Sequence, residues 1–241
     1  MGFYKIIPLH LGTITRPKSN MILDNPPSDE RGDFPLLAYY LEGARRILVD
    51  TGGNPPDDPY GQKAQPYART PEQELPNALR AAAGVAPADI EIVILTHLHW
   101  DHAANNHLLP NARFYCQRAE YDFIQNPTPE ASMGYEFERV RRTSYELVDG
   151  DARLFDSVSV LLTPGHTKGG QCVVVDTAEG KVVLTGDLVT LRESYRMDPP
   201  MPNGLCIDRK AMLASLSKVK AVSEKIMPGH DPSVLLPDAT W

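Results

Sequence analysis

The heptapeptide THLHWDH, which runs from Thr96 to His102, holds three of the seven histidines of this 241-residue chain, together with one aspartate. A surface loop has no use for so many imidazoles in so few positions, whereas a metal ion does. Imidazole and carboxylate groups are the ligands that Zn²⁺ and Fe²⁺ accept where no thiolate is offered. Because the apolar run 90–95 directly before it predicts a buried strand, we expect a metal-binding loop at the C-terminal end of that strand.

Three other predicted strand ends carry the same kinds of side chain. Each of these side chains follows a glycine, which lets the backbone turn sharply and approach a metal closely. With those of the heptapeptide they make seven candidate ligands: His97, His99, Asp101, His102, His166, Asp187 and His230. Seven ligands are too many for one tetrahedral ion, but they suit two ions that share a bridging ligand. Open positions on the two ions would make the site catalytic rather than structural.

The chain reads as two similar halves, each with strands, then a helix, then a strand. In the first half, Thr70 and a following proline begin a helix that Gly84 ends. In the second half, a Glu179-Gly180 turn joins two strands into a hairpin. This order suggests two β-sheets face to face with helices outside. The predicted strands are 3–11, 36–41, 46–50, 90–95, 114–116, 158–163, 171–176, 181–185 and 225–227, and the predicted helices are 70–84, 118–125, 137–147 and 208–219.

Length and composition fit one domain over residues 1–241. The net charge of −7 argues against nucleic acid or an anionic membrane as the partner, since both call for basic patches. The chain opens without a signal peptide pattern, and no apolar run approaches the roughly 18 residues of a membrane span. Cys116, Cys172 and Cys206 are widely spaced and suit reduced thiols in the cytoplasm. We therefore expect a cytoplasmic protein that acts on a small molecule.

The segment from His97 to His102, with His166, Asp187 and His230 downstream, resembles the metallo-β-lactamase superfamily. The resemblance covers nearly the whole chain and implies an α/β fold, the αββα four-layer sandwich, with two metal ions at one edge of the sheets. It also implies which residues hold each ion: His97, His99 and His166 the first, Asp101, His102 and His230 the second, with Asp187 bridging both. Two Zn²⁺ ions are the expected cofactors, and the same ligands also accept iron, cobalt or manganese.

Within the superfamily, the chain is most similar to the N-acyl-homoserine lactonases and to pyridoxolactonase-like enzymes. The segment RTPEQEL at 69–75 and Asn105-Asn106 behind the ligand loop are typical of that group. Exported β-lactamases lack the aspartate bridge, nucleic-acid-processing members carry basic exosites, and glyoxalase II thioesterases carry a basic C-terminal extension. The resemblance therefore implies a quorum-quenching type of hydrolase, which opens a lactone by attack of a metal-bridging hydroxide.

One position departs from that group. Its members have a tyrosine three residues after the bridging aspartate, where it hydrogen-bonds the lactone carbonyl, and here that residue is Thr190. Thr190 and Tyr195, which follows nearby, are therefore the candidate donors to the substrate. Asp101, a ligand with a free oxygen, is the candidate that passes a proton to the leaving alkoxide. Because threonine is shorter than tyrosine, a smaller or differently shaped lactone, ester or amide also fits.

Other functions stay open from the sequence. A thioesterase, esterase or amidase of the same fold would use the same ligands. A mononuclear iron sulfur dioxygenase would not need all seven, and a non-enzymatic metal-binding module tends to lose some of them.

The roles of three further features also stay open. Asp50 either orients a ligand histidine or caps a turn. The segment 53–76, with Tyr60 and Tyr67, either closes over the substrate, is disordered or forms a homodimer contact. The insert from Asn126 to Tyr145, with Met133, Tyr135 and Phe137, either lines the same pocket or packs a helix down.

Overall fold

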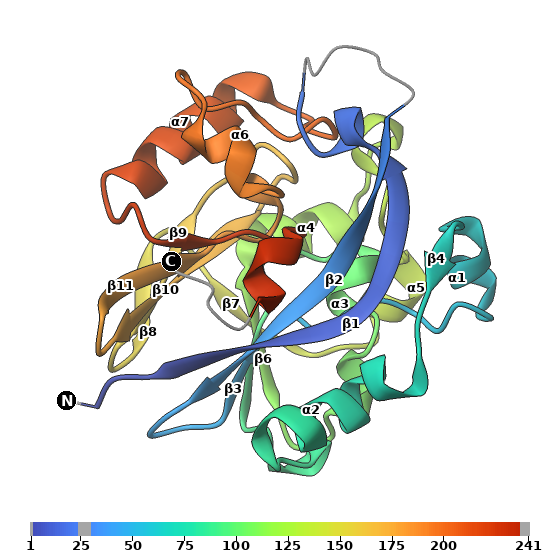
Figure 1. Ribbon diagram of the computed structural model, residues 1–241, viewed down its shortest axis with the longest axis vertical. Coiled ribbons are helices and arrows are strands. Elements are labelled where there is room, and N and C mark those ends of the chain that lie inside the picture. The colour runs from blue at the N-terminus through green and yellow to red at the C-terminus, as the bar shows by residue number, and fades with distance from the viewer. Residues whose placement is uncertain (1, 24–29, 237–241) are drawn as a thin grey trace.

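The computed structural model of the protein describes residues 2–23 and 30–236. Two β-sheets pack face to face in it (Figure 1). The strands of the first sheet lie in the order β4 (Tyr67–Ala68), β1 (Lys5–Pro17), β2 (Arg31–Glu42), β3 (Ile47–Val49), β5 (Ile92–Ile94), β6 (Arg113–Gln117) and β7 (Tyr145–Val148). Those of the second lie in the order β12 (Ile226–Met227), β11 (Gly180–Leu184), β10 (Gln171–Thr177), β9 (Val158–Leu162) and β8 (Ala152–Phe155).

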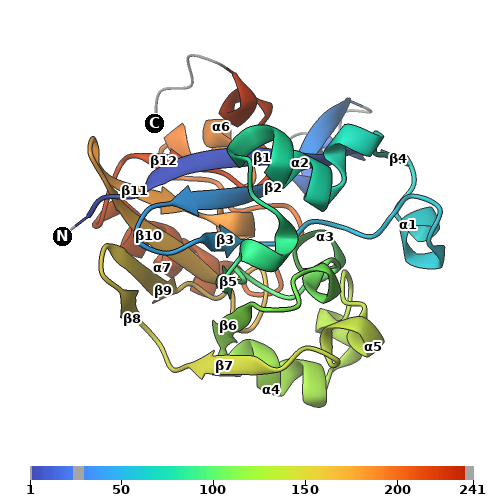
Figure 2. The same ribbon diagram turned by 90° about the horizontal axis from the view of Figure 1, so that it is seen from below.

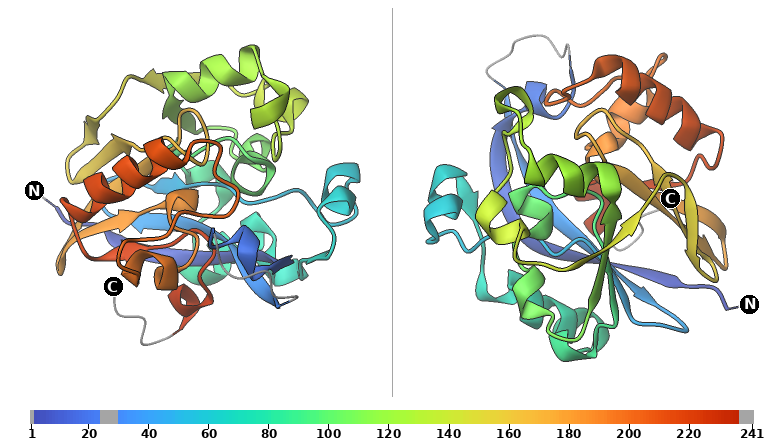
Figure 3. Two further views of the ribbon diagram at one scale, coloured as in Figure 1. Left: turned by 90° about the horizontal axis from the view of Figure 1, so that it is seen from above. Right: turned by 180° about the vertical axis from the view of Figure 1, so that it is seen from behind.

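Helices and short connections cover the outer faces of both sheets (Figure 2). The helices are α1 (Pro59–Lys63), α2 (Leu75–Ala83), α3 (Trp100–Ala103), α4 (Arg118–Gln125), α5 (Phe137–Val140), α6 (Arg192–Arg196) and α7 (Arg209–Lys220). The left view of Figure 3 shows α7, in orange-red, lying along the strands of the second sheet. No helix among the described residues is both long and apolar enough to cross a membrane.

Strand β2 explains why the first sheet must be covered on both faces. Its residues Leu36 to Leu41 are all buried, so the strand reads as a continuous apolar run rather than an alternating one. Because neighbouring side chains on a strand point to opposite faces, Leu37 packs between the sheets while Leu36 packs on the helical side. The helical side also buries Leu79 of α2 and Ile124 of α4.

The second sheet is covered in the same way. Its inner face contributes Val160 and Val173 to the core between the sheets. Its outer face buries Val174 against Met212 and Leu216 of α7. The order helix layer, sheet, sheet, helix layer is the αββα sandwich, which confirms the predicted fold class.

Some predicted elements were wrong in extent. The predicted helix 137–147 is instead the four-residue helix α5 followed by the strand β7, which pairs in parallel with β6. Pairing at this sheet edge overrides the local helical pattern. Thr70 begins a single 3₁₀ turn, with a capping box to Gln73, and α2 starts only at Leu75. Strand β8 was not predicted, and β1 runs six residues past the predicted end at Leu11.

Candidate metal centre

All seven candidate ligands lie together at one edge of the two sheets. The ligand loop 97–102 follows β5 and includes α3, while the other ligands follow β9, β11 and β12. In each of two triads the potential ligand atoms lie within 4.8 Å of one another. The triads are His97, His99 and His166, and Asp101, His102 and His230. These two groups match the sets that the family resemblance implies, and a third group, His97, His102 and Asp187, joins them.

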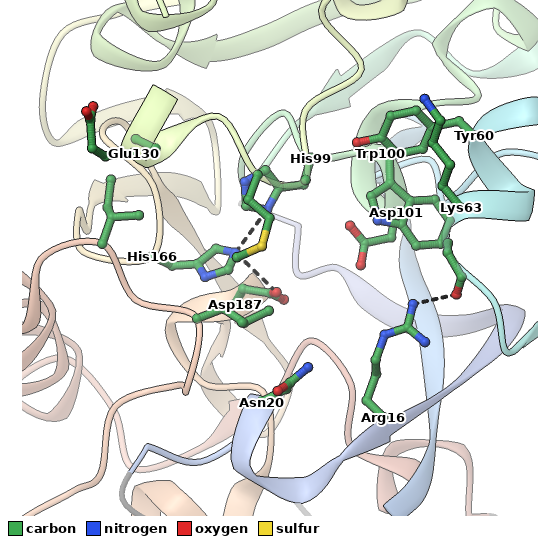
Figure 4. A pocket seen from close by; sticks show the side chains of 16 residues that line it. Arg16, Asn20, Tyr60, Lys63, His99, Trp100, Asp101, Glu130, His166 and Asp187 are labelled. Carbon is green, nitrogen blue, oxygen red and sulfur yellow. Dashed lines mark hydrogen bonds and ion pairs between the residues drawn. The ribbon is translucent and has the colours of Figure 1, made fainter. Parts of the chain in front are cut away.

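Asp187 lies between the two triads with one carboxylate oxygen turned to each. Its Oδ2 is 3.3 Å from Nε2 of His166 in the first triad, as Figure 4 shows. Its Oδ1 is 3.2 Å from Nε2 of His102 and 3.2 Å from Nε2 of His230 in the second triad. A carboxylate in this position is suited to bridge two cations.

Hydrogen bonds at Nδ1 orient two histidines of the second triad toward Asp187. His102 Nδ1 lies 2.8 Å from Asp50 Oδ2, and His230 Nδ1 lies 2.9 Å from the carbonyl oxygen of Pro35. Since both partners are acceptors, each Nδ1 carries a ring proton, and each Nε2 faces the Asp187 carboxylate. Although burial lowers the pKa of both imidazoles, the Asp187 carboxylate raises it above its ordinary value.

Unsatisfied atoms at the same place support a metal site. Among the described residues, the buried atoms without a hydrogen-bond partner include His97 Nε2, His102 Nε2 and Asp187 Oδ1, which belong to one cluster of potential ligands. Buried acceptors left unpaired cost free energy, and a shared cation would remove that cost. Nitrogen and oxygen donors without thiolate fit Zn²⁺, Fe²⁺, Co²⁺ or Mn²⁺.

The histidines of the first triad are kept neutral by their surroundings. Burial, together with the imidazoles of His102, His99 and His166, holds the pKa of His97 well below its ordinary value. Burial and His166 do the same to the pKa of His99. Burial alone would raise the pKa of Asp187, but the imidazoles of His230, His102 and His166 hold it well below its ordinary value. Neutral imidazoles and an ionised carboxylate are the forms that bind a metal.

Asp50 orients two of the ligand histidines, which decides between its two predicted roles. Besides His102, its carboxylate accepts hydrogen bonds from the backbone nitrogen and the hydroxyl of Thr96, both at 2.7 Å. The Thr96 hydroxyl oxygen in turn lies 3.1 Å from Nδ1 of His97. Asp50 adopts a positive φ of 62°, an uncommon conformation for a residue with a side chain. This strain is consistent with a carboxylate aimed at the ligands.

Glu120 links the ligand loops to one another, a role that the sequence does not predict. Its carboxylate is fully buried and accepts hydrogen bonds from the backbone nitrogens of Leu98 (3.1 Å) and Gly169 (2.8 Å) and from the hydroxyl of Tyr135 (2.6 Å). Tyr135 packs edge-on against His99, with the ring centroids 4.5 Å apart. Glu120 stands in the first turn of α4, where the helix dipole favours an acidic side chain. This ordinary placement gives no sign in the sequence that Glu120 contacts the ligand loops.

A pocket of about 460 Å³ opens beside the two triads. It is lined by Arg16, Asn20, Tyr60, Lys63, Ala64, His99, Trp100, Asp101, Glu130, Ala131, Met133, Gly134, His166, Asp187, Leu205 and Ile207 (Figure 4). Of the residues considered for the pocket wall, Tyr60 and Met133 line it. Tyr67 is buried behind it against Trp100, and Phe137 stacks on Tyr135.

Neither candidate hydroxyl donor faces the substrate pocket with a free proton. Thr190 is buried and donates its hydroxyl hydrogen to the carbonyl oxygen of Met21 at 2.6 Å. Tyr195 packs in the apolar layer under α7, and its hydroxyl donates to the carbonyl oxygen of Ser223 at 3.3 Å. Backbone carbonyls therefore take both hydroxyl protons in this structure, and contact of Thr190 or Tyr195 with a substrate stays a prediction.

Comparison with known proteins agrees with the site. The family model of the metallo-beta-lactamase superfamily matches residues 31–230, and the chain belongs to this superfamily. An N-acyl homoserine lactonase from Bacillus sp is 32% identical over 216 residues, which cover 83% of this chain and 82% of that protein. One from Bacillus thuringiensis is 31% identical over 220 residues, with the same coverage.

A solved structure agrees with the fold over nearly the full length. An N-acyl homoserine lactone hydrolase, solved with its product N-hexanoyl-L-homoserine at the catalytic metal centre, aligns with a TM-score of 0.81 at 26% identity. The alignment covers 98% of this chain and 96% of that one. With its histidine and aspartate triads, the protein is a metal-dependent hydrolase of this fold.

Proposed function

We propose that the protein is a lactonase with a dinuclear zinc centre. The observation that carries the proposal is the position of Asp187, whose two carboxylate oxygens face separate triads of ligand atoms beside a pocket of small-molecule size. The lactonase assignment is supported by N-acyl homoserine lactonases that match this chain over most of their length. Residues 1–241 are proposed to form one domain built around this centre.

The proposed ligand sets are His97, His99 and His166 for the first ion, Asp101, His102 and His230 for the second, and Asp187 for both. Two zinc ions held by these residues would supply a hydroxide nucleophile at neutral pH and a Lewis acid for the acyl oxygen. Nitrogen-rich sites with one shared carboxylate suit zinc, which requires no redox partner.

Asp101 is proposed to move the proton. It lies at the border of the metal site and the pocket, with Oδ2 3.7 Å from Nε2 of His230 and 9% of its surface exposed. A carboxylate placed there accepts a proton from the nucleophile and delivers it to the alkoxide that leaves when the ring opens. The apolar rim of Met133, Leu205 and Ile207 contacts the remainder of the substrate.

The test combines metal content with a substrate panel. Protein stripped with a chelator and reconstituted with zinc should hold two ions per chain by mass spectrometry, and lactone hydrolysis should appear only after reconstitution. The panel should include γ-lactones, δ-lactones, thioesters, simple esters and a β-lactam. Faster turnover of a thioester or ester than of any lactone would overturn the lactonase proposal. One iron per chain with oxygen uptake would overturn the hydrolase itself.

A further inference from the structure

Arg16 is one of two cations that line the pocket beside the metal centre; the other is Lys63. Arg16 lies near the end of β1 and lines the pocket beside the triads together with Asp101, Asp187 and His166. It also lines a smaller cavity of about 80 Å³, which Asp101, Asp187, Thr190 and His230 line as well. Arg16 therefore borders two spaces that contain metal-ligand candidates.

Backbone carbonyls hold the Arg16 guanidinium in one place. One terminal nitrogen donates to the carbonyl oxygen of Thr15 at 2.9 Å and, more weakly, to that of Pro66 at 3.4 Å. The other donates to the carbonyl oxygen of Ala64 at 2.5 Å. A guanidinium has five N–H groups, so donors remain for a ligand. Since the orientation is already fixed, little conformational entropy is lost when a ligand binds.

The charge of Arg16 is not balanced by a carboxylate within the described part of the chain. No described acid forms an ion pair with it, although Asp101 is near enough to favour its charged form. Arg16 is half-buried, so its solvent shell is partly lost, and this burial lowers its pKa. A half-buried, unpaired cation is costly, and an anionic ligand group would offset that cost.

The charges are unevenly distributed around the pocket. Figure 4 shows Arg16 and Lys63 on the right side, next to Asp101, and Glu130 on the left side beyond His166. Thr190 gives its proton to the carbonyl oxygen of Met21 and offers none to the pocket. The fixed hydrogen-bond donor on the side of the pocket near Asp101 is therefore the Arg16 guanidinium, a cation, rather than the neutral hydroxyl of Thr190.

We propose that the substrate is a lactone that carries a carboxylate, and that Arg16 binds this carboxylate. The inference rests on the proposed function and narrows it from neutral acyl lactones to anionic ones. Guanidinium and carboxylate match in a planar, bidentate pair, which gives both affinity and orientation. With the carboxylate held on the Arg16 side, the ring carbonyl of a small lactone lies toward Asp187 and the triads.

The test compares two substrates that differ only in charge. Zinc-reconstituted protein is assayed with γ-butyrolactone-γ-carboxylate and with the matching primary amide. We expect the wild type to hydrolyse the lactone that carries the carboxylate with a kcat/KM about 10- to 100-fold higher than that for the lactone that carries the amide. Arg16→Gln should remove this preference through a higher KM for the carboxylate and leave the amide within about threefold. Arg16→Lys, which keeps the charge but not the fork, should retain part of the preference.

The control is Lys18→Gln, which removes a positive charge two residues away. Lys18 pairs with Glu193 at 2.9 Å and does not line the pocket, so this variant should keep the full preference. Equal turnover of the two lactones by the wild type would overturn the inference and leave the lactonase proposal standing. An equal loss of kcat/KM on both lactones in Arg16→Gln would also overturn the inference. Arg16 would then contact the lactone ring that both substrates share, or only hold the backbone of residues 64–66 in place.

A binding measurement separates the two proposals. Tetrahydrofuran carboxylate, which has no ring carbonyl to hydrolyse, is titrated calorimetrically into wild type and Arg16→Gln. We expect about tenfold weaker binding to the variant. If no lactone were hydrolysed but this difference were found, the lactonase proposal would fail and the anion site would stand. Identical binding to both proteins would mean that the carboxylate binds the metals instead of Arg16, and the inference would fail.

Discussion

His102 and Asp50 form a buried hydrogen bond of 2.8 Å between Nδ1 and Oδ2, although fifty-one residues separate them in the sequence. The bond fixes the ring proton of His102 on Nδ1 and turns Nε2 toward Asp187. It also joins the turn after β3 to the ligand loop after β5, two strands that pair in parallel. The adjacency of these strands therefore determines which nitrogen of His102 faces the metal site.

Asp50→Asn should weaken metal binding more than it weakens the fold. An amide offers one acceptor oxygen where Thr96 and His102 now use two, so His102 loses its fixed tautomer and orientation. We expect metal affinity to fall about 10- to 100-fold, measured by titration of stripped protein with Zn²⁺. Asp156→Asn, at an exposed carboxylate, is the control and should bind as the wild type does. Unchanged affinity in Asp50→Asn would show that Asp50 serves only the turn.

Glu120→Gln tests whether the buried carboxylate positions the first triad. Gln can accept from Leu98 and Tyr135 with its oxygen, but its amide group would then face the N–H of Gly169, donor against donor. The loops of His99 and His166 should shift, and we expect zinc affinity to fall about tenfold. Glu146→Gln, at an exposed glutamate, is the matched control. Equal zinc affinity with a lowered melting temperature would assign Glu120 to stability alone.

Much of the site could be predicted because its candidate ligands directly follow predicted strands. A histidine or aspartate that follows an apolar run and a glycine can be recognised in the sequence. The ends of neighbouring strands lie at the same edge of a sheet, so such residues come close together. This pattern predicts His166, Asp187 and His230 as ligands without reference to their contacts. The fold class followed from the same pattern, since strands and helices alternate in two similar halves.

The remaining features depend on partners that are distant in the sequence. The sequence predicts Thr190 and Tyr195 as donors to the substrate, but in the structure their hydroxyls donate to the carbonyl oxygens of Met21 and Ser223. Glu120 looked like any acid in a first helical turn, and only its burial beneath the loops reveals its role. Sequence spacing gives local geometry, but it does not say which backbone group will take a proton from a remote side chain.

Stability of the metal-free protein should fall with rising pH because of Glu120. Burial, only partly offset by the hydrogen bond from Tyr135, raises the pKa of Glu120 above the ordinary value that it has in the unfolded chain. The folded state therefore holds this proton more tightly, and the contribution is full below about pH 4.3 and lost as pH rises through the folded pKa. The difference in unfolding free energy between wild type and Glu120→Gln should decline from pH 4.5 to pH 7 in urea titrations. A difference that grows with pH would contradict the shift.

Gly165→Ala should destabilise the protein strongly. Gly165 has a φ of +138°, and an added Cβ would lie 2.4 Å from Cβ and 2.5 Å from Cα of Met212 in α7. Strain and overpacking together should cost about 2–5 kcal/mol in urea unfolding. Gly84→Ala is the control, because Gly84 has a φ of +66° but open space around it, and it should cost only about 1–2 kcal/mol. Similar losses in both variants would mean that the contact with Met212 relaxes freely.

Asp101→Asn should separate metal binding from proton transfer. The amide oxygen can still face the second triad, so much of the zinc should remain, while the carboxylate that accepts and returns a proton is lost. We expect kcat to fall about 10²- to 10⁴-fold on an aliphatic lactone, whose leaving alkoxide must be protonated. Dihydrocoumarin releases a phenol with a pKa of about 10, which needs far less help, so the loss on it should be at least tenfold smaller. An equal loss on the two lactones, with zinc retained, would assign Asp101 to positioning, and retained turnover with lost zinc would remove it from proton transfer altogether.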